Sequence, residues 1–175
     1  MKKLLLVACL WAVVSAGWGK KPVVSHDMFV SPLGAIAVGP NGLPTNKAKI
    51  QPYCCPSDAI EISTSTVITE NDFQWILIPL QVHKSEIKGV SVCYSVSSKT
   101  TGATYISQTR LTQMTTPDKA LVVLDDPTNR TAMGPACYTV PASVSVEGTI
   151  TLELKVVFGS ANDKIRIGGI TIATK

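Results

Sequence analysis

From residue 59 onward, apolar and polar side chains alternate in runs that turn residues separate. In the clearest run, 149–158, one parity is entirely apolar: Ile150, Leu152, Leu154, Val156 and Phe158. A period of two places one set of side chains against a core and the other in water, which is typical of a β-strand. The pattern predicts eight strands, over 59–69, 73–82, 87–97, 104–114, 119–125, 136–146, 149–158 and 164–174.

Two of these strands depart from simple alternation. Both parities of 73–82 are apolar, which indicates a central strand or one covered by the N-terminal segment, with a bulge or an edge at Pro79. In 164–174, Gly168 and Gly169 shift the parity by one residue, which predicts a bulge that keeps four isoleucines on the core. We expect the last three strands to form an antiparallel meander, with a loop over 147–149 that pairs Val146 with Ile150.

No segment has a helical period, so the fold class is all-β. Eight strands with turn residues between them favour an antiparallel two-sheet β-sandwich, and a jelly roll is the leading topology. The domain is expected over 57–175.

The N-terminus has the features of a secretory signal peptide over 1–16. Lys2 and Lys3 precede an apolar run over 4–14, and Ser15 and Ala16 offer small residues for cleavage. The residues before Cys9 also fit a bacterial lipoprotein box, but the apolar core in front of it is too short, so we favour cleavage after Ala16. The mature protein is expected to be secreted, extracellular or at the cell surface, with the periplasm as a further location.

Residues 17–56 are rich in proline and glycine. Six of the eleven prolines lie between 22 and 56, where no helical period survives. We interpret the segment as an extended arm or linker, with a disordered tether as an equal alternative. Short edge strands are expected at 28–30 and 35–38.

Composition argues against a nucleic-acid partner. Without Lys2 and Lys3, 14 basic residues face 12 acidic ones, and the lysines are scattered instead of forming a basic stripe. No second apolar run is long enough to span a membrane.

Four cysteines remain after cleavage, and an even number in a secreted chain indicates disulfides. Cys93 and Cys137 each lie mid-strand on the face opposite to the neighbouring tyrosine, so this pair is preferred. The next choice joins Cys54 or Cys55 to Cys93 or Cys137, and a vicinal Cys54–Cys55 bond is a further alternative.

No catalytic set emerges from the sequence. His26 and His83 lack the spacing of metal ligands and lie in polar segments, and there is no G-x-S-x-G motif or glycine-rich phosphate loop. We therefore expect that the protein is not an enzyme and that it has no cofactor, except for the calcium considered next.

Two kinds of binding residue can be proposed from the sequence. Asp125, Asp126 and Asn129 offer oxygen ligands for calcium on one loop, although a capped polar turn explains them better. Asn162 and Asp163 form a weaker loop of the same type. Tyr53 and Tyr105 are the aromatic residues most expected to be exposed, where they could stack on sugars. Asn129 also begins a glycosylation sequon.

Three segments carry a resemblance to a known class: Val90-Ser-Val-Cys-Tyr, Ala136-Cys-Tyr-Thr-Val and Phe158-Gly-Ser-Ala-Asn-Asp-Lys-Ile-Arg-Ile-Gly-Gly-Ile. Over about 60–175 the chain resembles uncharacterised exported bacterial β-sandwich domains. The resemblance implies the fold and export, and it implies no functional residue.

The leading functional hypothesis is therefore a secreted or cell-surface module with a structural, adhesive or assembly role. Its partner would be an extracellular protein, a glycan or a second copy of the chain, in a homo-oligomer. The alternative is a carbohydrate-binding module, with or without calcium.

Overall fold

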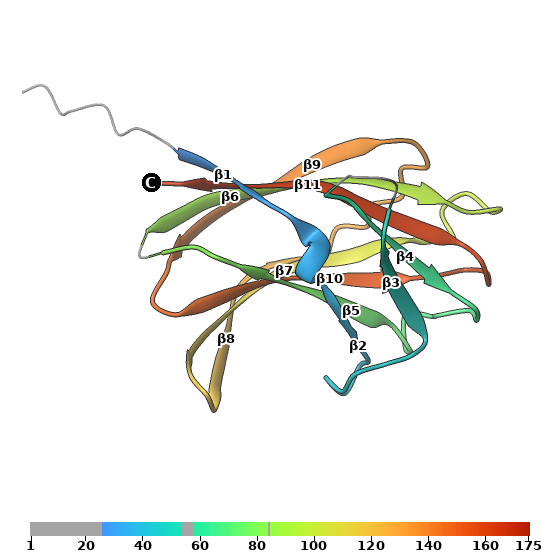
Figure 1. The fold of residues 1–175 in the computed structure, drawn as a ribbon, viewed down its shortest axis with the longest axis horizontal. Helices are drawn as coiled ribbons and strands as arrows, with labels where there is room; N and C mark the ends of the chain where they lie inside the picture. The colour runs from blue at the N-terminus through green and yellow to red at the C-terminus, as the bar shows by residue number, and fades with distance from the viewer. Residues whose placement is uncertain (1–25, 54–57, 84) are drawn as a thin grey trace, which may run out of the picture.

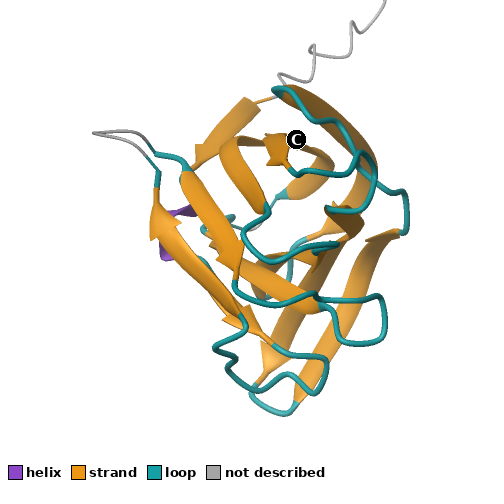
Figure 2. Ribbon diagram, turned by 90° about the vertical axis from the view of Figure 1, so that its right-hand side faces the viewer, coloured by secondary structure: helices purple, strands orange, loops and turns teal. Residues whose placement is uncertain are grey.

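The structure is a computed structural model that describes residues 26–53, 58–83 and 85–175. In this part of the chain it contains eleven β-strands, one 3₁₀ turn (η1, Pro32–Gly34) and no α-helix. The strands form two antiparallel sheets that face each other, as Figure 1 and the turned view in Figure 2 show. The predicted two-sheet β-sandwich is confirmed, with eleven strands where about eight were expected. The predicted signal peptide and both Cys54 and Cys55 lie outside the described residues.

The first sheet has six strands and is built around the last strand of the chain; we call it the β11 sheet. Its strands run in the order β3 (Ala48–Pro52), β4 (Ile60–Thr64), β11 (Lys164–Thr174), β6 (Glu86–Ser97) and β9 (Ala136–Ser145), and β1 (His26–Val30) also pairs with β11. Along one side of β11, β4 pairs with 164–167 and β1 with 170–174. The glycine pair therefore lies where β11 changes partner.

The second sheet has five strands, and we call it the β10 sheet. Its strands run in the order β2 (Ile36–Val38), β5 (Gln74–Leu80), β10 (Thr149–Val157), β7 (Tyr105–Thr116) and β8 (Lys119–Asp126). β2 reaches only as far as Leu77 on β5, so Pro79 pairs on the β10 side alone and occupies the expected edge position.

The core lies between the two sheets and consists mainly of isoleucine, valine and leucine. Ile165, Ile167, Ile170 and Ile172 of β11 are all fully buried, and the register against β6 shifts between Ile167 and Ile170. The predicted bulge at Gly168 and Gly169 is thus confirmed. Without the extra residue, either the first or the second pair of isoleucines would face water.

All eight predicted strands are present near their expected bounds, although β4 ends at Thr64 instead of 69. The two expected edge strands are present as β1 and β2, and β3 was not predicted. Residues 26–52 therefore contribute strands to both sheets, and β1 pairs with β11 of its own chain.

The predicted meander of the last three strands is wrong. β9 pairs with β6, β10 pairs with β5 and β7, and β11 pairs with β6, β4 and β1. The chain crosses from one sheet to the other after β9 and again after β10. Val146 and Ile150 are both buried because their strands lie in facing sheets. The backbone N–H of Val146 bonds the Ser85 carbonyl, so the three-residue hairpin inferred for 147–149 does not form.

The preferred disulfide is confirmed. Cys93 of β6 and Cys137 of β9 lie directly opposite each other, with their Cα atoms 4.0 Å apart. The bond joins residues separated by 44 positions, and closing a loop of that length in the unfolded chain is worth about 4 kcal/mol in the chain-entropy model. It also fixes the edge strand β9 to the sheet.

The crossing after β9 gives a testable prediction. A Cβ atom on Gly148 would lie 2.1 Å from the Met114 carbonyl oxygen, whereas one on Gly134 would meet nothing within 4 Å. We expect Gly148→Ala to lower the free energy of unfolding by about 1–3 kcal/mol, because the backbone at 114 must move. Urea denaturation measures the loss. Gly134→Ala is the control, and equal stability of the two variants would contradict the packing described for this crossing.

Candidate functional site

Aromatic and charged side chains gather on the outward face of the β10 sheet. Residues Ile76, Ile78 and Leu80 of β5 face the core, so Trp75 and Leu77 point outward. The strand register extends these positions into two rows across the sheet. One row runs from Trp75 through Lys155 to Gln108, and the other runs from Leu77 through Glu153 to Arg110.

The aromatic rings of this face are held in defined orientations. Phe73 and Trp75 make an edge-to-face contact with ring centroids 5.8 Å apart. The Lys155 ammonium lies 4.2 Å from the centroid of Phe73, and the Arg110 guanidinium lies 4.7 Å from that of Trp75. Such cation–π contacts contribute about 0.5–1 kcal/mol each at exposed sites. They position the rings more than they stabilise the fold.

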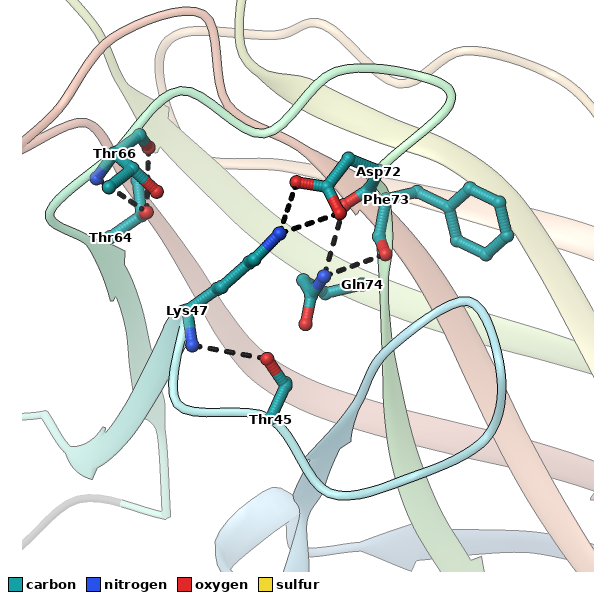
Figure 3. A network of polar contacts seen from close by, with 7 residues as sticks. All are labelled: Thr45, Lys47, Thr64, Thr66, Asp72, Phe73 and Gln74. Atoms are coloured by element: carbon teal, nitrogen blue, oxygen red, sulfur yellow. Dashed lines mark hydrogen bonds and ion pairs between the residues drawn. The ribbon is translucent and has the colours of Figure 1, made fainter.

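The loop before β5 places Phe73 beside Trp75. The Gln74 amide is buried and donates hydrogen bonds to the carbonyls of Asp72 and Phe73, at 3.0 and 2.8 Å. Lys47 binds the Asp72 carboxylate at 2.6 Å, which ties this loop to the start of β3. Figure 3 shows these contacts and the Phe73 ring pointing away from them.

Ion pairs surround the rings. Glu70 binds Lys155 at 2.9 Å and accepts a hydrogen bond of 2.9 Å from the Tyr105 hydroxyl. Burial alone would raise the pKa of Glu70, but the hydrogen bonds from Lys155 and Tyr105 hold it below its ordinary value of 4.5. Burial and the bond to Glu70 raise the pKa of Tyr105.

Two buried polar atoms on the same face have no hydrogen-bond partner among the described residues. Arg110 binds Asp125 through a terminal nitrogen at 3.4 Å, but its buried Nε has no hydrogen-bond partner among the described residues. The buried Thr112 hydroxyl, two residues along β7, is also unsatisfied in this part of the chain. Buried polar groups normally find a partner, so these two atoms are exceptions on this face.

The two tyrosines predicted as ligand-binding residues lie on opposite faces of the sandwich. Tyr105 belongs to the face just described, whereas Tyr53 lies beside Arg166 on the outward face of the β11 sheet. Sequence reasoning expected both faces of the strand that holds Phe73 and Trp75 to be covered, because both of its parities are apolar. Phe73, Trp75 and Leu77 are as apolar as Ile76, Ile78 and Leu80, so the alternation held no signal that could have placed them outside.

The residues proposed for calcium do not converge on one point. Asp125 points outward to Gln108 and Arg110, whereas Asp126, the next residue of β8, binds Arg130 at 2.6 Å. Asn129 is exposed in the connection that follows β8. In the described ranges, no group of three or more His, Cys, Asp or Glu residues could hold a metal. The calcium site stays a prediction without geometric support.

The loop at Asn162 and Asp163, the weaker calcium candidate, is a tight turn. Asn162 has a φ of 70°, and Asp163 is buried and accepts hydrogen bonds from Ser98 and Thr104 at 2.8 and 2.5 Å.

His26 and His83 are both exposed. Among the residues that the structure describes, no helix is long and apolar enough to cross a membrane.

No family model matches the sequence, and no curated protein matches it. Solved structures do share the fold. The CBM22-1 xylan-binding domain of Paenibacillus barcinonensis Xyn10C aligns with a TM-score of 0.52 at 10% identity, covering 84% of this chain and 92% of that one. A CBM4 structure aligns with a TM-score of 0.52 at 8% identity, over 83% and 89% of the two chains.

A third similar structure is the C-terminal CBM6 of LamC, a marine laminarinase from Zobellia galactanivorans. It aligns with a TM-score of 0.50 at 11% identity, over 86% of this chain and all of that one. At these identities the comparisons show the β-sandwich fold, which the resemblance of residues 60–175 also implied.

The contacts of Glu70 give a second prediction. Tyr105→Phe removes one hydrogen bond to the carboxylate, so the pKa of Glu70 should rise toward 4.5. Carboxyl-carbon NMR titration of both proteins measures the change. Because the folded-state pKa is lowered, the stability that these contacts give is present above pH 4.5 and is lost as the pH falls through the folded-state value. An unchanged pKa in the variant would contradict the hydrogen bond.

Proposed function

We propose that this domain is a non-catalytic carbohydrate-binding module and that a neutral polysaccharide lies across the outward face of the β10 sheet. The observation that carries the proposal is the double row of outward side chains on β5, β10 and β7, in which Lys155 lies between Trp75 and Gln108. The rows cross three adjacent strands, so they offer successive contacts to an extended chain.

The chemistry of this face matches that of a sugar. A pyranose ring has apolar C–H faces, which pack against aromatic rings, and hydroxyl groups that donate and accept hydrogen bonds. The Arg110 side chain is 25% exposed and bonds Asp125 through one terminal nitrogen at 3.4 Å, so its other terminal N–H groups can bond such hydroxyls. Lys155 and Arg110 already pair with Glu70 and Asp125, and Glu153 adds a further negative charge, so an uncharged chain is favoured over an acidic one.

The fold and the predicted leader agree with this role. The Paenibacillus barcinonensis domain, which shares the sandwich fold, is a xylan-binding domain, and this supports the proposed role. An exported module that holds a polysaccharide would work outside the cytoplasm, either in solution or at the cell surface. Adhesion through a glycan would be one form of the structural or adhesive role expected from the sequence. Binding on the outward face of the β10 sheet needs no calcium.

The test is the affinity of the mature protein for soluble neutral polysaccharides, including xylan, mixed-linkage β-glucan, laminarin and mannan, measured by isothermal titration calorimetry. We expect at least one of them to bind, and Trp75→Ala to weaken that binding at least tenfold, about 1.4 kcal/mol. A thermal melt of the variant confirms that it is folded.

Phe29→Ala is the matched control. Phe29 is the most exposed large apolar side chain of the described residues, at 81%, and it lies on the opposite sheet, opposite Thr171 of β11. Its removal should leave the affinity unchanged. Binding to none of the polysaccharides, or equal binding by the wild type and Trp75→Ala, would overturn the proposed function.

A further inference from the structure

The outward face of the β11 sheet carries a separate groove of about 350 Å³. Its walls include Tyr53, Ser95, Ala136, Arg166, Gly168 and the Cys93–Cys137 disulfide. Most of this surface is apolar, and the disulfide holds the β9 side of the groove to β6. The volume is at the lower end of the range of small-molecule sites, about 300–1,000 Å³, so it suits a single sugar unit or two better than a long chain.

A buried carboxylate organises the charges beside the groove. Glu61 of β4 is only 3% exposed, and it binds Lys164 at 2.8 Å and the Arg166 Nε at 3.0 Å. Burial raises the pKa of Glu61, but the hydrogen bonds from these two cations hold it below its ordinary value, so the group is ionised at neutral pH. Two cations share one carboxylate, which leaves one positive charge in excess.

That charge is presented in a fixed position. The Arg166 guanidinium lies 4.1 Å from the centroid of the Tyr53 ring, while its Nε is held by Glu61. Its terminal nitrogens make no hydrogen bond with the described residues, and the side chain lines the groove. A guanidinium held at one end presents its remaining N–H groups in the planar arrangement that binds a carboxylate through two parallel hydrogen bonds.

We propose that this groove is a second binding site, for a hexuronic acid unit of an acidic glycan. The carboxylate of the sugar pairs with Arg166, with Lys164 adding attraction, and the apolar face of the ring packs along Tyr53 and the disulfide. A free inorganic anion would make no use of the apolar walls. The proposal is independent of the neutral chain assigned to the β10 sheet. With sites on opposite faces, one domain would bridge a neutral and an acidic polysaccharide.

The experiment titrates isotope-labelled mature protein with oligogalacturonate and, separately, with its fully methyl-esterified form, and follows backbone NMR shifts. We expect oligogalacturonate to shift residues of β6, β9 and β11 around the groove and to bind at least tenfold more tightly than the ester. Raising the salt concentration should weaken this binding.

Three variants assign the site. Arg166→Gln should reduce the affinity for oligogalacturonate at least tenfold, and so should Tyr53→Ser, which leaves the ion pairs of Glu61 intact. Lys88→Gln removes the same charge from an exposed position of β6, where Lys88 pairs with Glu86, and should bind like the wild type. A thermal melt shows whether Arg166→Gln is folded, and Tyr53→Ser decides the question if it is not.

The inference is overturned by no binding of oligogalacturonate, by equal binding of the ester, or by full affinity in both groove variants. If acetate or a peptide with a free C-terminus competes as strongly as the oligosaccharide, the groove recognises a carboxylate alone and the sugar assignment is wrong. Loss of neutral polysaccharide binding in Trp75→Ala has no bearing on these outcomes, so the two proposals fail separately.

Discussion

Burial of the facing surfaces of two sheets is the constraint on which the rest of this structure depends. β10 and β11 lie in the middle of the two sheets, and their inward side chains are almost fully buried. Each buried isoleucine, leucine or valine contributes about 1.5–3 kcal/mol relative to an exposed one. Since the central strands bury alternate positions in this way, the remaining positions are left on the two outward faces, and both candidate sites lie there.

The two outward faces differ in chemistry. On the β10 sheet, two aromatic rings lie between ion pairs in which each cation has its own acid. On the β11 sheet, one buried acid holds two cations beside an apolar groove. Exposed ion pairs stabilise a fold by at most about 1 kcal/mol each. The exposed pairs of the β10 sheet therefore contribute little to the stability of the sandwich, and we propose that their arrangement serves a ligand.

How much the sequence could predict depended on whether a feature is local. The alternation in 149–158 and the glycine pair in 164–174 each determine which side chains face inward. The structure contains both the predicted strand and the predicted bulge. The Cys93–Cys137 bond was predicted because each cysteine lies mid-strand, on the face opposite to that of the tyrosine that follows it in sequence. The meander failed because alternation shows which side of a strand is buried, and not whether Val146 and Ile150 belong to paired or to facing strands. Trp75 was misplaced because its strand is apolar on both sides.

The charge groupings could not have been read from the chain, because they join residues far apart in sequence. Glu61 meets Arg166 across 105 positions, and Tyr105 meets Glu70 across 35. Such contacts depend on the order of strands in each sheet, which the local pattern does not determine.

The central claim is that a neutral glycan contacts the outward face of the β10 sheet. The most direct measurement is a crystal structure of the mature protein with the neutral oligosaccharide that binds it most tightly. The account predicts sugar rings against Trp75, with hydroxyl groups bonded to the exposed N–H groups of Arg110. Density for the sugar in the groove beside Tyr53, or between the edge strands β8 and β9, would contradict it.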